Sequence, residues 1–233
     1  MGWIVNKIIG PVADLVFPRV CHVCGVRLSR GESFLCLPCI ARLPRTNYHR
    51  IPMNGVEKRL AGIVRFRRAG AHFFYNRESD VATLLHDVKY RGFPALGRRL
   101  GKLIGDELRI TDYLDDVDFI VPVPMHFLKK ARRGYNQTDH IAAGLSAASG
   151  IPVLNAIKAI RGHKTQTSLS MEERLKNTSG IFRVVDPALI AGKHILVVDD
   201  VCTTGSTMIS IGDCLREQAP ATDVSFYTVG CTV

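Results

Sequence analysis

The sequence predicts an α/β protein with a mostly parallel sheet and helices on both faces, preceded by a small four-cysteine zinc ribbon. Segments of strand character alternate with segments of helical period, which is the pattern of a parallel sheet with crossover helices. Residues 195–198 are all apolar, as is typical of a strand buried on both faces. Two Cys-x-x-Cys pairs lie near the N-terminus. The 233 residues, 46% of them hydrophobic, suffice for one domain with a core and a small appendage.

The first segment, residues 1–17, predicts a short amphipathic helix. Its apolar residues include Trp3, Ile8 and Val12, but Lys7 and Asp14 interrupt them and no small-residue cleavage site follows. This favours a helix that packs on the protein over a signal peptide. A helix lying on a membrane surface stays open as an alternative. No apolar run approaches the roughly 20 residues of a membrane-spanning helix.

Residues 18–45 predict a zinc ribbon. Two Cys-x-x-Cys pairs, separated by eleven residues, offer the thiols of Cys21, Cys24, Cys36 and Cys39. Four soft ligands on two tight turns match a closed tetrahedral zinc site. So short a segment cannot bury a core of its own, so the metal would hold it together. Two disulfides or a redox pair are the alternative, although no thioredoxin-like strand precedes either pair.

Cysteine count and charge add two further expectations. The total of seven cysteines is odd and no export signal is present, which predicts a reducing, cytoplasmic location. Residues 1–112 hold 19 Lys and Arg against 9 Asp and Glu, whereas residues 113–233 hold 12 of each. A basic first half suggests an anionic partner, either nucleic acid or a polyphosphate substrate. A solvated basic surface without a partner is the alternative.

The rest of the chain, residues 50–233, predicts the α/β domain, after a linker over 44–52. Its segments of strand character are 62–75, 119–124, 195–198 and 224–229, and another strand begins at 153–154. Its segments of helical period are 81–90, 96–108, 138–148 and a helix that opens just after residue 207. Residues 161–180 are polar, with one short helix at 171–176.

Three loops are expected to converge, because ligands of such sheets bind beyond the carboxyl ends of the strands. The loop after Val123 carries Lys129, Lys130, Arg132 and Arg133. The loop over 161–170 carries Arg161, His163, Lys164, Thr165 and Gln166, and we expect it to act as a mobile lid. A disordered surface loop is the alternative for this second segment.

The third loop, after residue 198, carries the most specific chemistry. Asp199 and Asp200 end the apolar run, and Thr203-Thr204-Gly205-Ser206-Thr207 opens the next helix. A loop at a helix N-terminus collects free N–H groups, which suits a phosphate. The two carboxylates suit sugar hydroxyls or a divalent metal. Together they predict a site for a phosphorylated sugar, against the alternative of an ordinary strand and capped helix. A P-loop is set aside, because residues 97–103 lack its spacing and its Ser or Thr.

Residues 195–207 resemble the 5-phosphoribosyl-1-pyrophosphate (PRPP) motif of type I phosphoribosyltransferases. The order of motifs along the chain resembles the ComF/GntX family from about residue 18 onward. After the four cysteines come Leu-Leu-His-Asp-Val-Lys-Tyr-Arg-Gly, Val-Pro-Val-Pro and Arg-Arg-Gly-Tyr-Asn-Gln. A polar stretch from Gln166 to Asn177 and the PRPP motif follow. The family is named for a role in competence, the uptake or use of DNA.

The resemblance implies a ligand and roles for named residues. PRPP would bind with Mg²⁺, and its binding residues would be Asp199, Asp200, Val201, Thr203, Thr204, Gly205, Ser206 and Thr207. The catalytic residues would be Asp199, Asp200, Arg161 and Lys164, and the pyrophosphate would also meet Lys89, Arg132 and Arg133. Residues 50–92 would form the hood that recognises the acceptor.

The resemblance leaves two functions open. One is transfer or binding of a phosphoribosyl group to an acceptor that the sequence does not name. The other is a non-catalytic PRPP-binding protein that acts in DNA uptake or utilisation through its basic zinc-ribbon half, with DNA or the competence machinery as partner. The loop cations favour an enzyme, because a protein that only binds PRPP need not keep them.

Overall fold

The computed structural model describes residues 18–91, 93–160 and 180–233. The chain divides into two compact units with the boundary between Leu43 and Pro44. The amphipathic helix predicted for residues 1–17, the lid at 161–170 and the short helix at 171–176 lie outside the described residues. None of the helices in the described ranges is long and apolar enough to cross a bilayer.

The first unit is built on one tight turn and the start of one helix, which carry the cysteines. In the turn, the Gly25 N–H donates to the Cys21 carbonyl at 2.9 Å, and Gly25 has a φ of +71° that favours glycine. The second pair spans the start of helix α2 (Leu37–Arg42), which begins directly after Cys36. Only a few apolar side chains, among them Phe34 and Leu35, are buried in this unit. So small a core is consistent with a unit that depends on its cysteine cluster.

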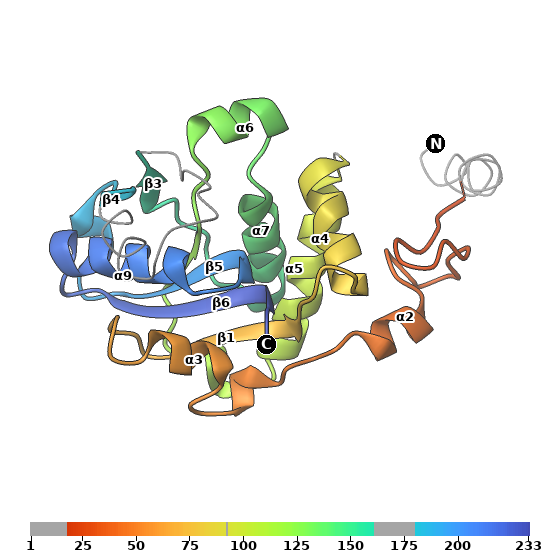
Figure 1. Cartoon of the computed structure of the whole chain (residues 1–233), viewed down its shortest axis with the longest axis horizontal. Helices are drawn as coiled ribbons and strands as arrows, with labels where there is room; N and C mark the ends of the chain where they lie inside the picture. The colour runs from red at the N-terminus through yellow and green to blue at the C-terminus, as the bar shows by residue number, and fades with distance from the viewer. Residues whose placement is uncertain (1–17, 92, 161–179) are drawn as a thin grey trace, which may run out of the picture. The chain divides into compact units, whose positions relative to one another are not determined.

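The second unit contains a four-stranded sheet whose strands are all parallel (Figure 1). The strands are β1 (Ala69–Phe74), β2 (Phe119–Pro122), β5 (His194–Cys202) and β6 (Asp223–Cys231), in the order β1-β6-β5-β2. Almost every residue of the two central strands, β5 and β6, is buried. This explains the apolar run at 195–198 in β5 and the large apolar side chains of β6, since both faces of these strands are covered.

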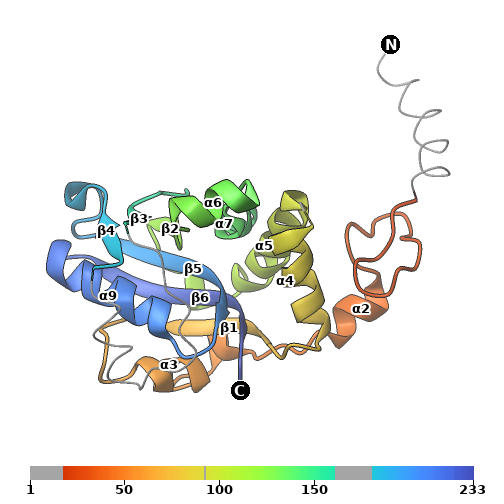
Figure 2. The ribbon, with the colours of Figure 1, turned by 45° about the horizontal axis from the view of Figure 1, so that its top comes forward.

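Helices cover both faces of this sheet, as predicted (Figures 1 and 2). On one face, Phe226 of β6 shares a core cluster with Leu60 of α3 (Gly55–Leu60) and Ile211 of α9 (Ser206–Gln218). On the other face, α7 (Gln137–Ser149) packs on β2 and β5, and α5 (Pro94–Leu108) packs on α7. Helix α4 (Asp80–Tyr90) packs on α5.

Short elements complete the second unit. Strands β3 (Ile157–Ala159) and β4 (Phe182–Val184) form a separate antiparallel pair, and α6 (Phe127–Arg133) follows β2. Three single 3-10 turns are η1 (Tyr48–Arg50), η2 (Asp112–Leu114) and η3 (Pro187–Leu189).

The prediction of a linker over 44–52 was wrong. The Phe74 N–H of β1 donates to the Pro44 carbonyl at 2.8 Å, and the Thr46 hydroxyl donates to the Ala71 carbonyl. Thr46 and His49 are buried. The segment therefore runs along the outer edge of β1 and belongs to the second unit, because its polar groups satisfy an otherwise open strand edge.

Three other boundaries differ from the prediction. Strand character over 62–75 is confined to 69–74, because Val64 packs instead against Gly212 of α9. Residues 153–154 make only a single bridge, in which Val153 pairs with Ile120, and they start no strand. The loop after Val123 contains α6, which is a helix at positions predicted to be irregular.

Strand β5 is longer than predicted and contains the acid pair. It continues to Cys202, where β6 still pairs with it, so Asp199 and Asp200 lie inside the strand's carboxyl end. Pairing with β6 compensates for the low strand propensity of aspartate. The predicted hood, residues 50–92, contains β1, which is a strand of the main sheet.

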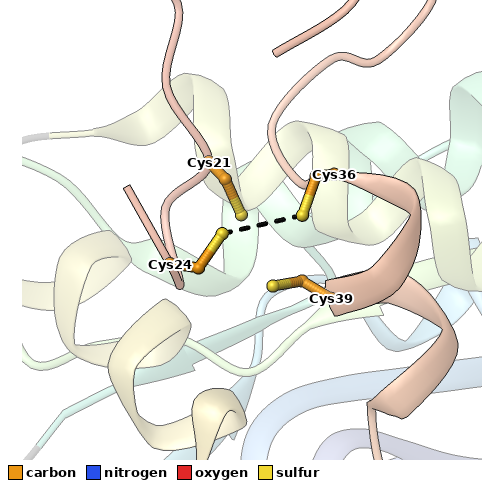
Figure 3. A group of neighbouring side chains, drawn as sticks. All are labelled: Cys21, Cys24, Cys36 and Cys39. Atoms are coloured by element: carbon orange, nitrogen blue, oxygen red, sulfur yellow. Dashed lines mark hydrogen bonds between the residues drawn. The ribbon is translucent and has the colours of Figure 1, made fainter. Parts of the chain in front are cut away.

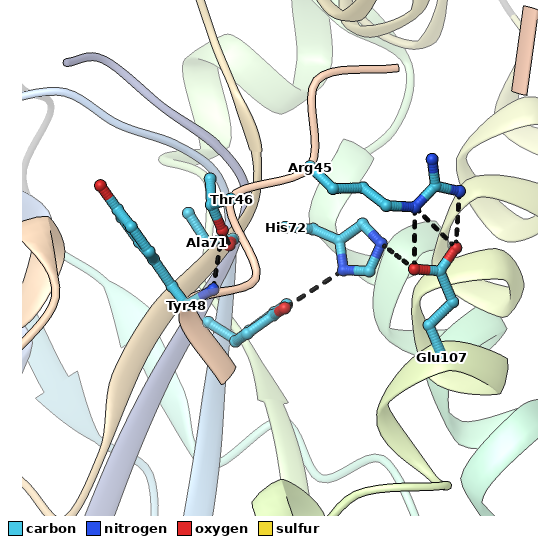
Figure 4. A network of polar contacts seen from close by, with 7 residues as sticks. Arg45, Thr46, Tyr48, Ala71, His72 and Glu107 are labelled. Atoms are coloured by element: carbon cyan, nitrogen blue, oxygen red, sulfur yellow. Dashed lines mark hydrogen bonds and ion pairs between the residues drawn. The ribbon is translucent and has the colours of Figure 1, made fainter. Parts of the chain in front are cut away.

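A partly buried ion-pair network fixes the edge strand β1 against α5 (Figure 4). Arg45 Nε and Nη2 donate to the Glu107 carboxylate at 3.0 and 2.8 Å, and His72 Nε2 lies 3.2 Å from Glu107 Oε2. The other His72 nitrogen lies 3.1 Å from the Tyr227 hydroxyl. Burial opposes ionisation of Glu107, but the His72 and Arg45 contacts outweigh it and lower the pKa of this carboxyl to about 2.

Candidate functional site

The acid pair on β5 is met by side chains from two helices on one face of the sheet. Lys89, near the end of α4, places its Nζ 2.7 Å from Asp200 Oδ2. Gln137, the first residue of α7, donates from Nε2 to the same oxygen at 2.9 Å. Asp200 is buried, so these two donors compensate for the loss of solvent around its charge.

Asp199 has a different environment from its neighbour. It is half-buried, and one of its oxygens accepts the Asp200 N–H at 2.8 Å. Burial, followed by the adjacent Asp200 charge, raises the pKa of Asp199 to about 7, and the Asp200 N–H and Lys89 only partly offset this. The two acids are therefore inequivalent: Asp200 is held by direct donors, and Asp199 lies close to its protonation midpoint at neutral pH.

The loop after β5 has the geometry of an anion site. Gly205 has a φ of +81°, and α9 begins at the next residue. The N–H groups of a first helical turn have no partner inside the helix and carry the positive end of its dipole. A Cβ on Gly205 would lie 3.1 Å from Leu60 Cδ2, so glycine is required here for two reasons. The Arg59 guanidinium stabilises the loop by donating a hydrogen bond to the Thr203 carbonyl at 2.8 Å.

A pocket of about 220 Å³ joins these parts. Among the described residues, its lining includes both acids, Thr207 at the start of α9, and three cations. The cations are Lys89 from α4 and Lys129 and Arg133 from α6. The lining also includes apolar side chains, among them Ala159, Ile181 and Phe182 from the β3–β4 region. An anionic ligand with a flat or apolar portion would find complementary groups in this lining.

The structure brings together part of the predicted site. Two of the three expected loops, after Val123 and after Val198, converge on the pocket. Lys89 and Arg133 line it, but Arg132 is exposed on α6 and is not among its lining residues in the described part of the chain. Arg161 and Lys164 lie outside the described residues. Thr203 and Thr204 are exposed on the adjoining loop.

Sequence reasoning missed Gln137. Its signal was present in Arg-Arg-Gly-Tyr-Asn-Gln, a polar run placed directly before a helix at the carboxyl edge of the sheet. The run supplies several contacts at this edge. Asn136 Nδ2 and the Thr138 hydroxyl donate to the Val123 carbonyl at 3.1 and 2.7 Å, and Arg133 donates to Gln137 Oε1. The side chains therefore fix the start of α7 to the end of β2.

The four cysteines of the first unit form a second candidate site (Figure 3). Their sulfur atoms all lie within 4.8 Å of one another, and the Cys24 and Cys36 sulfurs are 3.6 Å apart. A tetrahedral zinc site with bonds of about 2.3 Å has sulfur–sulfur edges of about 3.8 Å. The arrangement fits such an ion, and all four thiols are free of disulfides.

Electrostatics within the cluster also fit a cation. Burial opposes ionisation of Cys21, but N–H groups of Cys24, Cys36 and Val23 outweigh it and lower its pKa to about 6. Burial and the neighbouring sulfurs raise the pKa of Cys39. One thiolate thus forms readily and opposes the formation of others, a repulsion that a divalent cation would relieve.

The chain is similar in sequence to proteins of competence and DNA utilization. A family model described as a phosphoribosyl transferase domain matches residues 109–231. The DNA utilization protein YhgH of Escherichia coli O157:H7 is 30% identical over 219 residues, which cover 89% of this chain and 95% of that protein. Competence protein ComFC of Bacillus subtilis is 28% identical over 242 residues, which cover 97% and 95%.

A solved structure adds a distant likeness. Glutamine PRPP amidotransferase from B. subtilis is 22% identical to this chain, with a TM-score of 0.42. The aligned region covers 62% of this chain and 30% of that protein's chain. The family is established by the domain match together with relatives that span most of the chain. The chain therefore belongs to the ComF family of competence and DNA utilization proteins, and residues 109–231 form its phosphoribosyltransferase domain.

Proposed function

We propose that the pocket at the carboxyl edge of the sheet binds PRPP with Mg²⁺ and transfers its phosphoribosyl group. One observation carries the proposal: an acid pair, the first turn of a helix and three cations among the described residues all contribute to the lining of a single pocket. Each of these groups suits a different part of PRPP. A simple metabolite without both a sugar and a polyphosphate would leave some of them without a partner.

The sugar phosphate would lie at the loop after β5. The first-turn N–H groups of α9, with the hydroxyls of Thr203, Thr204, Ser206 and Thr207, would hold the 5-phosphate beside Gly205. Val201 lies between this loop and the acids. Asp199 and Asp200 would accept hydrogen bonds from the ribose 2- and 3-hydroxyls.

The pyrophosphate would lie on the side of the cations. Lys89, Lys129 and Arg133 all line the pocket and can approach its oxygens. The carboxylates and substrate oxygens provide the hard ligands that Mg²⁺ prefers, and the ion supplies charge neutralisation at the pyrophosphate. Arg132, Arg161 and Lys164 are proposed as further pyrophosphate contacts from the sequence motifs alone, as is the role of 161–170 as a lid.

Catalysis would rest on electrostatic stabilisation at both ends of the breaking bond. As pyrophosphate leaves, positive charge would develop on the sugar ring, and the Asp199 carboxylate would stabilise it. The cations stabilise the departing anion. The apolar lining at Ala159, Ile181 and Phe182 would exclude water from one side of the activated sugar.

The cysteine cluster is proposed to bind one structural zinc ion. A closed set of four thiolates leaves no position for a catalytic water, so the ion would brace the first unit. The seven cysteines are all free thiols, which is consistent with a reducing cytoplasm.

A second function is supported by the names of the relatives and by the charge of the chain. These relatives are called DNA utilization and competence proteins, and the net charge of +10 lies within residues 1–112. A non-catalytic protein that binds PRPP and acts on DNA through this basic half would share the pocket. It would need no acceptor.

Pyrophosphate release separates the two functions. Wild-type protein with PRPP and Mg²⁺ is mixed with a panel of acceptors: ammonia, nucleobases and single-stranded DNA. If the protein is a phosphoribosyltransferase, the wild type should release pyrophosphate with at least one acceptor, and the Asp199→Asn, Asp200→Asn double variant should release none. PRPP binding without release across the panel would support the second function. That function further predicts a DNA affinity that falls steeply with salt.

A further inference from the structure

We propose that Gln137 is a positioning residue that fixes the rotation of the Asp200 carboxylate, so that Asp199 is the acid of the pair that can turn to follow the ligand. The inference rests on the proposed binding of PRPP at this pocket. It concerns a residue outside the PRPP motif, since Gln137 and Asp200 are 63 positions apart in the sequence.

Both donors to the Asp200 side chain contact the same carboxylate oxygen. Both Gln137 Nε2, at 2.9 Å, and Lys89 Nζ, at 2.7 Å, converge on Oδ2. Donors from two different helices therefore set the rotation of this carboxylate. A carboxylate held in this way cannot turn to follow a ligand without losing a charge-assisted hydrogen bond.

The Gln137 amide itself has only one useful orientation. Its Oε1 accepts a hydrogen bond from the Arg133 guanidinium, while its NH₂ group faces Asp200. A flipped amide would place its carbonyl against the carboxylate and its NH₂ group against the guanidinium, losing both contacts. The Arg133 guanidinium in turn lies over the Tyr90 ring, 5.1 Å from its centroid.

The backbone around Gln137 is equally constrained. The residues on either side, Asn136 and Thr138, both donate to the Val123 carbonyl, and all three are buried. Tyr135 donates from its hydroxyl to the Val88 carbonyl near the end of α4. Gln137 is therefore held by its neighbours in the chain, and its contact with Asp200 is not the chance reach of a flexible surface side chain.

The Asp199 side chain is held less tightly than that of Asp200. Among the described residues, its side chain accepts the Asp200 N–H at 2.8 Å, and it lines the same pocket as Thr207. A sugar hydroxyl can therefore reach Asp199 without breaking an ion pair.

The test compares variants in calorimetric titrations with PRPP and Mg²⁺. Gln137→Glu keeps the size of the side chain but turns the donor into a second carboxylate facing Asp200. We expect its affinity for PRPP to fall on the order of tenfold to a hundredfold. Gln137→Met removes the donor without adding charge and should lose on the order of tenfold. The matched control is Gln218→Glu, because a carboxylate there can still accept the Val184 N–H and lies away from the pocket.

A swapped pair separates positioning from simple stability. In the Gln137→Glu, Asp200→Asn double variant, the amide and the carboxylate exchange places, so the hydrogen bond between them can form again. We expect its thermal midpoint to recover relative to Gln137→Glu, while its affinity for PRPP stays low because the charge has left β5. A swap that restores both would show that the contact is only structural and would overturn the inference.

The remaining outcomes are also decisive. If the wild-type protein binds PRPP and both Gln137 single variants bind it with the same affinity, the role of Gln137 would be overturned, while the proposed function would stand. Wild-type protein that binds no PRPP would overturn the proposed function, and with it this inference. Reduced affinity in both Gln137 variants, with Gln218→Glu within about threefold of wild type, would support the inference.

Discussion

Replacing Asp199 by asparagine is expected to stabilise the folded protein above neutral pH while weakening its ligand affinity. The pKa of Asp199 is raised from 3.8 to about 7 because the group is buried beside Asp200. Between about pH 4 and 7 the folded state therefore holds a proton that the unfolded state has released. The free energy of unfolding of the wild type accordingly falls as pH rises through this window.

The size of the effect follows from the shift. A difference of about 3 pKa units corresponds to roughly 4 kcal/mol at most, at about 1.4 kcal/mol per unit. Asp199 is only partly buried, so solvent screening reduces the expected value to about 1–2 kcal/mol. Asparagine cannot ionise and keeps an oxygen that accepts the Asp200 N–H, so the variant should escape this loss.

Urea unfolding at about pH 4.5 and pH 8 measures the effect. The stability difference between Asp199→Asn and wild type should grow by about 1–2 kcal/mol from the lower to the higher pH. Asp115→Asn is the control, because this aspartate is exposed and away from the pocket. Parallel pH dependences in wild type and Asp199→Asn would refute the reasoning about the acid pair.

Three further variants test other parts of the structure. Glu107→Gln should cost about 1–2 kcal/mol at neutral pH. Because the pKa of Glu107 is lowered to about 2, the stabilisation that its carboxylate provides is present above about pH 4.5 and lost as pH falls toward 2. When unfolding is measured across this acid range, the free energy of unfolding should therefore fall less in Glu107→Gln than in wild type. Gly205→Ala should lower the thermal midpoint and the PRPP affinity, since an L side chain is strained at φ +81° and meets Leu60; unchanged values would contradict this. Cys36→Ser should reduce bound zinc, measured by metal analysis, from about one equivalent to near zero; wild-type protein with two disulfides and no metal would refute the site.

The local sequence pattern was sufficient to predict the central features of the fold. The apolar run at 195–198 lies in a strand buried on both faces, and the helical periods over 81–90 and 96–108 correspond to α4 and α5. The spacing of the cysteines predicted a cluster whose sulfurs do converge. In each case the information lies within a few residues, where periodicity and spacing act directly.

Features that depend on distant partners were not predictable in the same way. Residues 44–52 contain proline and polar residues and resemble a linker, yet Pro44 and Thr46 bind the edge of β1. The acids lie inside β5 because β6 continues to pair with them. Nothing in the sequence near Gln137 indicates that Asp200 is its partner, since the contact exists only after β5 and α7 have packed together.

The most direct test of the central claim is a calorimetric titration of the purified protein with PRPP in the presence of Mg²⁺. The account predicts saturable binding of one PRPP per chain to the wild type. The Asp199→Asn, Asp200→Asn variant should lose most of this affinity while its circular dichroism spectrum stays unchanged. Wild-type affinity in that folded double variant, or absence of binding to the wild type, would contradict the assignment of the pocket.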